Sequence, residues 1–325
     1  MLLPETKVYG GRLRDQEQLR MSSSGGAFTA LSDVFFSSEN AVVCSIYNYN
    51  NHQQEYRLIT TKDERDKARG SKYIQSIPGN IFRVAERWLK DNPEKELLFV
   101  GMGCQAAGFK SYAETKGFRS RTIIVDIICH GSPSPELWKE YLKHIEKKGK
   151  INNITFKDKR NGWKAPTAVA TVDGVEISLD PYVKIFYNRK GLRPSCHKCP
   201  YATIERTTDI TIGDFWHIDE KMPEKYDEMG TSLFLVHTKK GLNIFDRAKN
   251  SIEWFESNTN DCWQLNLEMP TPMAKDRDLF WQDYYTYGID HIIKKYGMDS
   301  VIDVVKRNVK KIMYRIITGK CKSNN

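Results

Sequence analysis

The stretch Glu96-Leu-Leu-Phe-Val-Gly-Met-Gly-Cys-Gln-Ala-Ala-Gly108 decides the fold class of this chain. An apolar run, a glycine turn and a helix-forming segment are typical of a strand that carries a functional side chain at its carboxyl end. The device repeats in Arg121-Thr-Ile-Ile-Val-Asp-Ile-Ile-Cys-His-Gly-Ser-Pro133, after which Pro135 opens another helix. Two successive strand–turn–helix units predict that Cys104 and Cys129 lie near one another at one edge of a sheet.

The flanking sequence extends this pattern in both directions. Strands are predicted at 41–47 and 54–60, at 208–217 and at 230–241, and residues 166–180 alternate like a hairpin about Asp173-Gly174. A helix is predicted over Ile81–Asp91, with Phe82, Val84, Ala85 and Leu89 facing inward. From about Leu242 the composition turns helical and polar. We therefore expect an α/β fold, with a mixed sheet flanked by helices and a basic helical C-terminal extension.

Composition places limits on the class of protein. Hydrophobic residues make up 40% of the 325 residues and charged residues 28%, as in globular proteins. No apolar run approaches the roughly 18–20 residues that cross a bilayer. The N-terminus has neither the basic segment nor the apolar core of a secretory signal. We expect a cytoplasmic protein.

The net charge of +9 raises the question of nucleic-acid binding. The charge is scattered and no recognition motif accompanies it, so we expect no nucleic-acid partner. Residues 300–317 combine an apolar stripe with basic residues on the remaining face. Such a helix either makes peripheral contact with an anionic membrane or packs on its own domain.

The cysteines are the candidate metal ligands of this chain. In a reducing compartment the pair Cys196 and Cys199, within Arg193-Pro-Ser-Cys-His-Lys-Cys-Pro200, is more often metal-binding or redox-active than a structural disulfide. A four-cysteine zinc site usually draws on two such pairs, and the flanking prolines suit a loop clamp better than a thioredoxin-type helix start. Iron–sulfur clusters accept thiolates from dispersed loops, so Cys104 and Cys129 complete a four-thiolate set. Zinc, or no metal, remains the alternative; Cys44, Cys262 and Cys321 are predicted to be ordinary thiols.

Two loops are candidates for binding phosphate. Ser24, Gly25 and Gly26 precede an apolar run at helical spacing, and the free N–H groups of a helix start attract anions. Gly70, Ser71, Lys72 and Tyr73 follow Arg69, so that charge can grip a phosphate while the tyrosine stacks on a ring. From these residues alone, a Ser-capped helix and a solvated loop are the preferred interpretations.

Taken in order, seven motifs resemble the coenzyme F420 hydrogenase/dehydrogenase β-subunit family of iron–sulfur flavoproteins. The resemblance covers roughly residues 7–241. The motifs are Ser23-Ser-Gly-Gly, Arg69-Gly-Ser-Lys-Tyr-Ile-Gln-Ser, Phe99-Val-Gly-Met-Gly-Cys-Gln, Cys129-His-Gly-Ser-Pro-Ser, Phe156-Lys-Asp-Lys, Arg193-Pro-Ser-Cys-His-Lys-Cys and Asp209-Ile-Thr-Ile-Gly-Asp-Phe-Trp.

The resemblance implies one [4Fe–4S] cluster and one FAD. By the same correspondence, Cys104, Cys129, Cys196 and Cys199 hold the cluster, and the two phosphate-binding candidates contact the flavin. The family's usual Gly-Thr-Pro-Cys-Gln is here Gly-Met-Gly-Cys-Gln, which loosens that turn but keeps the cysteine. The resemblance also implies a flavin- and cluster-binding domain over residues 1–241. The remaining residues, 242–325, are predicted to form a helical extension.

The function that this resemblance implies is electron transfer. Many members carry an N-terminal ferredoxin module that this sequence does not show, so we expect a separate electron carrier, such as a ferredoxin, and an organic small-molecule substrate. Bacterial members are associated with polysaccharide synthesis. The alternative is a non-catalytic module with a structural metal in a surface-polysaccharide pathway. His130, Asp158 and Tyr73 are candidates for a proton donor.

Overall fold

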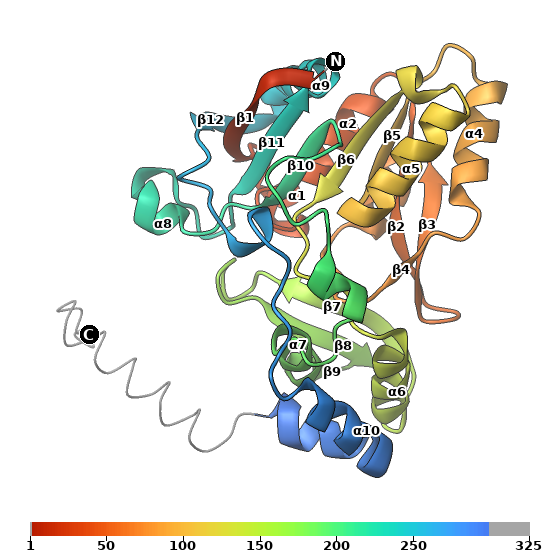
Figure 1. Cartoon of the computed structure of the whole chain (residues 1–325), viewed down its shortest axis with the longest axis vertical. Coiled ribbons are helices and arrows are strands. Elements are labelled where there is room, and N and C mark those ends of the chain that lie inside the picture. The colour runs from red at the N-terminus through yellow and green to blue at the C-terminus, as the bar shows by residue number, and fades with distance from the viewer. Residues whose placement is uncertain (1, 299–325) are drawn as a thin grey trace.

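A nine-stranded mixed sheet forms the centre of the molecule in the computed structural model, which describes residues 2–298. Its strand order is β12-β1-β11-β10-β6-β5-β2-β3-β4 (Figure 1). The strands are β1 (Leu2–Leu13), β2 (Ala41–Asn48), β3 (Gln53–Ile59), β4 (Ser76–Ile77), β5 (Leu97–Met102), β6 (Thr122–Ile127), β10 (Ile210–Asp214), β11 (Ser232–Thr238) and β12 (Ile252–Ser257).

Helices cover both faces of this sheet. They are α1 (Gln16–Met21), α2 (Ala27–Phe36), α3 (Lys62–Ala68), α4 (Ile81–Asp91), α5 (Gly103–Thr115), α8 (Ile218–Lys221) and α9 (Lys239–Ala248). Along β5 the side chains alternate: Leu98 packs in the core with α2 and α9, whereas Leu97 and Phe99 pack in the core with α4 and α5. A strand buried on both faces explains the continuous apolar run in the sequence.

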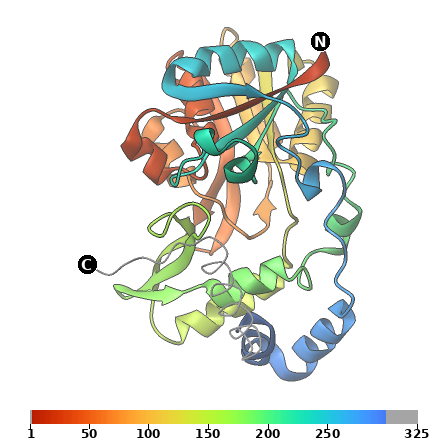
Figure 2. The ribbon, with the colours of Figure 1, turned by 90° about the vertical axis from the view of Figure 1, so that its left-hand side faces the viewer.

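A second lobe lies below the sheet, as Figures 1 and 2 show. Its three-stranded antiparallel sheet has the order β7-β8-β9 and is packed by three helices around its own aromatic core. The elements are β7 (Ile151–Asp158), β8 (Thr167–Val172), β9 (Val175–Ser178), α6 (Pro135–Glu146), α7 (Asp180–Tyr187) and α10 (Arg277–Ile292). A short helical segment, η6 (Ile293–Gly297), follows α10.

The predicted α/β class is confirmed, and so are the strand-end units. β5 and β6 are parallel neighbours, with Met102 opposite Ile127, and β10 is parallel to β6. Their carboxyl ends therefore meet at one edge, and Cys104 and Cys129 each follow within two residues. The hairpin about Asp173-Gly174 is also present, as β8 and β9.

Two local predictions were wrong. Val84 of α4 is 37% exposed, because the buried stripe of that helix runs through Ile81, Ala85 and Leu89. The segment after Leu242 was expected to be helical, yet β12 pairs antiparallel with β1 at the edge of the sheet. Its exposed residues alternate with partly buried ones, a weak signal for a strand.

The helix predicted at 300–317 lies outside the described residues. Within residues 2–298, no helix is long and apolar enough to cross a membrane.

A buried carboxylate ties three elements of the main sheet together. Asp209 accepts two hydrogen bonds from Arg119 at 2.9 and 2.8 Å, one from the Ile124 amide at 2.8 Å and one from the Thr238 hydroxyl at 2.7 Å. The side chain is fully buried. A buried carboxylate with all its partners satisfied stabilises the fold, because removing it leaves those donors unpaired.

Asp209→Asn is therefore expected to lower the free energy of unfolding by about 3 kcal/mol. Urea denaturation followed by circular dichroism measures this. The matched control is Asp246→Asn, which removes only the surface ion pair with Lys249 and is expected to cost at most about 0.5 kcal/mol. Equal losses of unfolding free energy in the two variants would contradict the stabilising role of Asp209.

Candidate functional site

A cavity of about 450 Å³ opens at the carboxyl ends of β5, β6 and β10. It is lined by residues 100–102, 127–131 and 212–214 from those strand ends, and by Lys157, Phe186 and Tyr187 from the second lobe. The volume is typical of a small-molecule or cofactor site. Parallel strands in open α/β sheets place their ligands in this position.

The turn before α2 forms one wall of the cavity. Ser24 and Gly26 line it, and both have positive φ, at 50° and 84°. The Ser24 hydroxyl donates to the Thr231 carbonyl at 2.8 Å, and Lys159 Nζ donates to the Ser24 carbonyl at 2.5 Å. These hydrogen bonds of Ser24 therefore stabilise the conformation of the turn. The N-cap residue of α2, Gly26, provides no side-chain cap, and the first amide, of Ala27, donates to Ser232 Oγ at 3.3 Å.

Gly25 has a different role from its neighbours. It does not line the cavity, and a Cβ at this position would overlap the Gly11 carbonyl oxygen and the Ser232 amide. Glycine is required here because the turn presses directly against β1 and β11. Gly25 therefore shapes the site without forming its surface.

The second predicted loop forms the adjoining wall. Gly70 has a φ of 84°, and Ser71 Oγ lies 3.2 Å from Ser23 Oγ, which joins the two loops. Lys72 Nζ donates to the carbonyls of Ala68 and Arg69 at 2.6 and 2.7 Å. No carboxylate in the described part of the chain pairs with Lys72. Burial lowers the pKa of Lys72 to about 8, since the low-dielectric surroundings disfavour its charged form.

Arg69 belongs to the site as well, although the sequence drew attention mainly to the residues after it. Its guanidinium pairs with Asp66 at 2.8 Å and with Gln18. Its Nε and Nη1 atoms are buried and have no partner among residues 2–298. Because Arg69 also lines the cavity, these unpaired donors are suited to an anionic group of a ligand.

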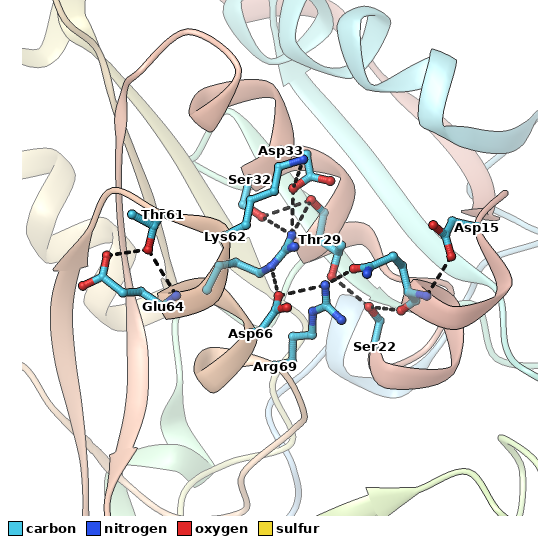
Figure 3. Close-up of polar contacts among 12 residues, drawn as sticks. Asp15, Ser22, Thr29, Ser32, Asp33, Thr61, Lys62, Glu64, Asp66 and Arg69 are labelled. Carbon is cyan, nitrogen blue, oxygen red and sulfur yellow. Dashed lines mark hydrogen bonds and ion pairs between the residues drawn. The ribbon is translucent and has the colours of Figure 1, made fainter.

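Arg65 donates hydrogen bonds to residues of α2 and α3 that Figure 3 labels, namely Thr29, Ser32, Asp33 and Asp66. Its Nη1 donates to the Thr29 carbonyl, the Ser32 hydroxyl and the Asp33 carboxylate at 3.0–3.2 Å, and its Nε donates to Asp66 at 2.6 Å. Asp66 then binds Arg69. The network fixes α3 against α2, so the two cavity-forming loops keep one spacing. Arg65 was missed in the sequence, where it is one charge among several in a charged helix.

Aromatic rings form the part of the wall that belongs to the second lobe. The Tyr73 ring stacks on Phe186 with centroids 4.6 Å apart, and its hydroxyl lies 2.8 Å from that of Tyr187. His130 lies against Phe186 and Tyr187 at 5.3 and 5.6 Å. These rings connect the Gly70 loop to the segment that follows Cys129. Tyr187 and Phe186 carried no sequence signal beyond their aromatic character.

A buried ion pair lies on the same side. Lys157 Nζ is 2.5 Å from Asp214 Oδ2, and Trp163 Nε1 donates to Asp214 Oδ1 at 3.1 Å. Burial opposes ionisation of Asp214, yet Lys157 and Trp163 bring its pKa below the ordinary value. Asp214 is therefore an ionised acceptor at the cavity wall. By contrast, Asp158 does not line the cavity and pairs with Arg160.

The four predicted cysteines lie in three segments of the chain, one of which lines the cavity. Cys129 lines it, Cys104 is exposed near the start of α5, and Cys196 and Cys199 lie in and just after the short helix η2 (Pro194–Lys198). Burial raises the pKa of Cys129 to about 12, and the other three thiols raise it further. Burial also raises the pKa of Cys104, followed by the charges of Cys199 and Cys196.

Contacts of neighbouring residues bring these segments together: the Ser132 amide donates to Cys196 Sγ at 3.3 Å, and a Cβ on Gly103 would lie 3.1 Å from Tyr201 Cβ. Among residues 2–298, no group of three or more His, Cys, Asp or Glu side chains is placed so that it could hold a metal ion. Cys262 is buried away from the cavity, whereas Cys44 is also buried but lines the cavity.

Unpaired polar atoms surround the thiols. His130 Nε2, His197 Nε2 and Ser132 Oγ are buried and have no partner in the described part of the chain. Thr271 contacts both histidines, because its hydroxyl donates to the His130 carbonyl at 2.5 Å and its carbonyl lies 2.8 Å from His197 Nδ1. Buried polar groups are normally satisfied, so these atoms suit a group that accepts hydrogen bonds beside the thiols.

A second buried ion pair supports the cysteine-bearing loops. Arg206 Nη1 donates to Asp126 at 2.9 Å, and the Thr208 and Thr211 hydroxyls donate to the same carboxylate at 2.7 and 2.6 Å. A Cβ on Gly103 would lie 3.1 Å from Arg206 Nη1 and 3.2 Å from Asp126 Oδ2. The pair thus lies directly beneath the residue that precedes Cys104.

Comparison with known proteins was made for both sequence and structure. No curated protein sequence matches the chain. Among solved structures, one chain of the F420-reducing [NiFe] hydrogenase complex from Methanosarcina barkeri has a TM-score of 0.50, with 17% identity over 89% of this chain and 90% of that one. At this identity the match shows a shared fold.

The family comparison is more specific. Residues 94–260 match the family model that describes the C terminus of the coenzyme F420 hydrogenase/dehydrogenase beta subunit, and they contain all four predicted cysteines. The matched segment is more than half of the chain. The chain therefore belongs to the coenzyme F420 hydrogenase/dehydrogenase β-subunit family.

Proposed function

We propose that this protein is an iron–sulfur flavoprotein oxidoreductase that passes electrons between a separate carrier and an organic substrate. The proposal uses one [4Fe–4S] cluster and one FAD. The observation that carries it is a cofactor-sized cavity lined by Cys129, next to which the Ser132 amide donates to Cys196 Sγ at 3.3 Å. Family membership supports a redox role, since the family is one of oxidoreductase subunits.

The residues at the thiols fit an iron–sulfur cluster. Iron–sulfur clusters are held by cysteine thiolates, and their potentials respond to hydrogen bonds and to exposure. The thiols with raised pKa values would gain from coordination, since a metal ligand must be deprotonated and the metal stabilises that form. His130, His197 and Ser132 would donate to the cluster through atoms that are otherwise unpaired.

The cavity fits a flavin dinucleotide. The start of α2, the free donors of Arg69 and the positive charge of Lys72 suit a pyrophosphate group. The wall of Tyr73, Phe186 and Tyr187 suits a flat ring. Since Cys129 lines the same cavity, the flavin and the thiols would be close enough to exchange electrons.

The bound cofactors would supply one-electron chemistry at the thiols and two-electron, hydride-type chemistry in the cavity. The chain's own residues position and protect these centres. Lys72 and Arg69 place positive charge at the cavity wall, and Asp214 remains ionised beside Lys157. The Tyr73 and Tyr187 hydroxyls and His130 lie where a substrate proton would be delivered, whereas Asp158 does not.

The substrate is proposed only by class, as an organic small molecule. Placement in polysaccharide biosynthesis rests on the resemblance of the sequence motifs. Separate carriers are reasonable because the relative from Methanosarcina barkeri is part of a larger hydrogenase complex. A peripheral membrane contact through residues 300–317 rests on the sequence pattern of that segment.

Replacing one thiol tests the cluster assignment. Cys199→Ser is expected to lose at least half of the bound iron after anaerobic purification, because a hydroxyl is a poor ligand for a cluster. Iron and acid-labile sulfide are measured per chain, and circular dichroism checks the fold. Cys262→Ser is the control, since that thiol is buried elsewhere and donates to Thr259. Unchanged iron in Cys199→Ser would refute the four-thiolate site.

Replacing Lys72 tests the cavity. Folding lowers the pKa of Lys72 from 10.5 to about 8. Between pH 8 and pH 10.5 the unfolded chain therefore binds more protons at this group than the folded chain, so the free energy of unfolding rises with pH over that range. Lys72→Met removes the cost of burying the cation. The flavin-free variant should therefore be stabilised relative to wild type most at pH 7, and less at pH 9.5.

The same substitution should weaken FAD binding by about tenfold or more at pH 7, because a charge-assisted contact is lost. Lys67→Met, on the exposed end of α3, is the control and should change neither property. Fluorescence titration with FAD and urea denaturation provide the measurements. Wild-type FAD affinity in Lys72→Met would remove Lys72 from the flavin site.

A further inference from the structure

The four thiols are exposed unequally, and this gives the site two sides. Cys129 lines the cavity, whereas Cys104 is exposed at the surface and Cys196 and Cys199 are partly buried. A group held between them would therefore face the cavity on one side and solvent on the other. The solvent side is where another protein could approach without entering the cavity.

Charge is distributed unevenly around the solvent side. Between Asp180 and Glu205 the sequence has no acidic residue, but it contains Lys184, Arg189, Lys190, Arg193 and Lys198. Arg193 and Lys198 are exposed on either side of Cys196. Lys190 is paired with Asp276 at 2.5 Å and contributes less to the free charge. The loop that carries two of the thiols therefore presents a positive surface.

An aromatic hollow of about 440 Å³ adjoins this loop. Arg193 and Pro194 form one side, and Arg277, Trp281, Tyr284 and Tyr285 of α10 form the other. Tyr285 is 79% exposed, and Arg277 lies over the Trp281 ring at 5.4 Å. Figure 2 shows η2 and the segment leading to α10 along one edge of the molecule. Exposed Trp, Tyr and Arg are the residues that dominate binding at protein interfaces.

We propose that Arg193, Lys198 and the hollow beneath Tyr285 form the docking face for an acidic one-electron carrier protein. The inference rests on the proposed function. Opposite charges would guide the carrier to the loop, and the hollow would accept a side chain of the carrier. Glu136 is the acidic residue that lines the hollow, together with the cations Arg193 and Arg277.

The electron balance sets the stoichiometry. A reduced carrier gives one electron at the thiol side and leaves oxidised by one electron. A second reduced carrier repeats the step, so two carriers supply the two electrons that reduce an organic substrate, and two protons come from solvent through groups in the cavity. Electron-transfer complexes have small, transient interfaces, which a face of this size can provide.

The test uses the purified holoprotein and a reduced plant-type [2Fe–2S] ferredoxin, an acidic carrier, in anaerobic stopped-flow mixing. The variant Arg193→Glu/Lys198→Glu should lower the second-order rate of reduction by about tenfold or more at low salt. The difference should shrink to within about threefold at about 0.5 M salt, where exposed charges are screened. The conservative variant Arg193→Lys/Lys198→Arg should retain the wild-type rate.

Two controls separate docking from damage to the site. Lys90→Glu/Lys116→Glu makes the same change of charge on α4 and after α5, away from the thiols, and should keep the wild-type rate. Reduction by dithionite, a small molecule that needs no docking face, should be equal in all variants. Tyr285→Ala should raise the carrier concentration for half-maximal rate by about threefold or more, with unchanged salt dependence.

Equal rates for the Arg193/Lys198 and Lys90/Lys116 variants in fully loaded protein would overturn the docking face and leave the proposed function standing. An unchanged half-maximal concentration in Tyr285→Ala would overturn the role of the hollow. Wild-type protein that contains neither iron nor flavin would overturn the proposed function, and the docking face with it.

Discussion

The buried ion pair between Asp126 and Arg206 is the interaction on which the site depends. Arg206 also donates to the carbonyls of Thr203 and Asn266, so a single guanidinium joins β6, the loop after Cys199 and the segment near Thr271. Burial raises the pKa of Asp126, and Arg206 with two threonine hydroxyls offsets part of that rise. A buried charge is tolerated only with such complete pairing. The loops that carry the thiols are consequently held by polar contacts rather than by apolar packing.

This support explains why the cysteine-bearing segments, distant in sequence, meet at one edge of the sheet. β5 and β6 are parallel, so the residues after them leave the sheet at the same edge. The clamp of Cys196 and Cys199 returns to that edge, where the Ser132 amide donates to Cys196 Sγ at 3.3 Å. The second lobe then closes the cavity with its aromatic wall. Each side of the thiol group therefore has a distinct environment, one lined by rings and cations and one open to solvent.

Much of this arrangement could be predicted from local sequence. The apolar runs that end at Cys104 and Cys129 indicated two parallel strands, because only strands buried on both faces are so continuously apolar. The return of the Cys196 and Cys199 clamp to the edge of the sheet could not be derived from spacing, since it depends on contacts between distant loops. Arg65 shows the same limit, because it is one charge in a polar segment until α2 packs against α3. β12 was missed because an edge strand with one exposed face has a weak apolar pattern.

The central claim is that the four thiols hold an iron–sulfur cluster beside a flavin. Metal, sulfide and flavin analysis of wild-type protein purified without oxygen, together with its visible absorption spectrum, tests this most directly. The account predicts a brown protein with about four iron atoms per chain, an equal amount of acid-labile sulfide and about one flavin. A colourless protein with stoichiometric zinc and no flavin would contradict it.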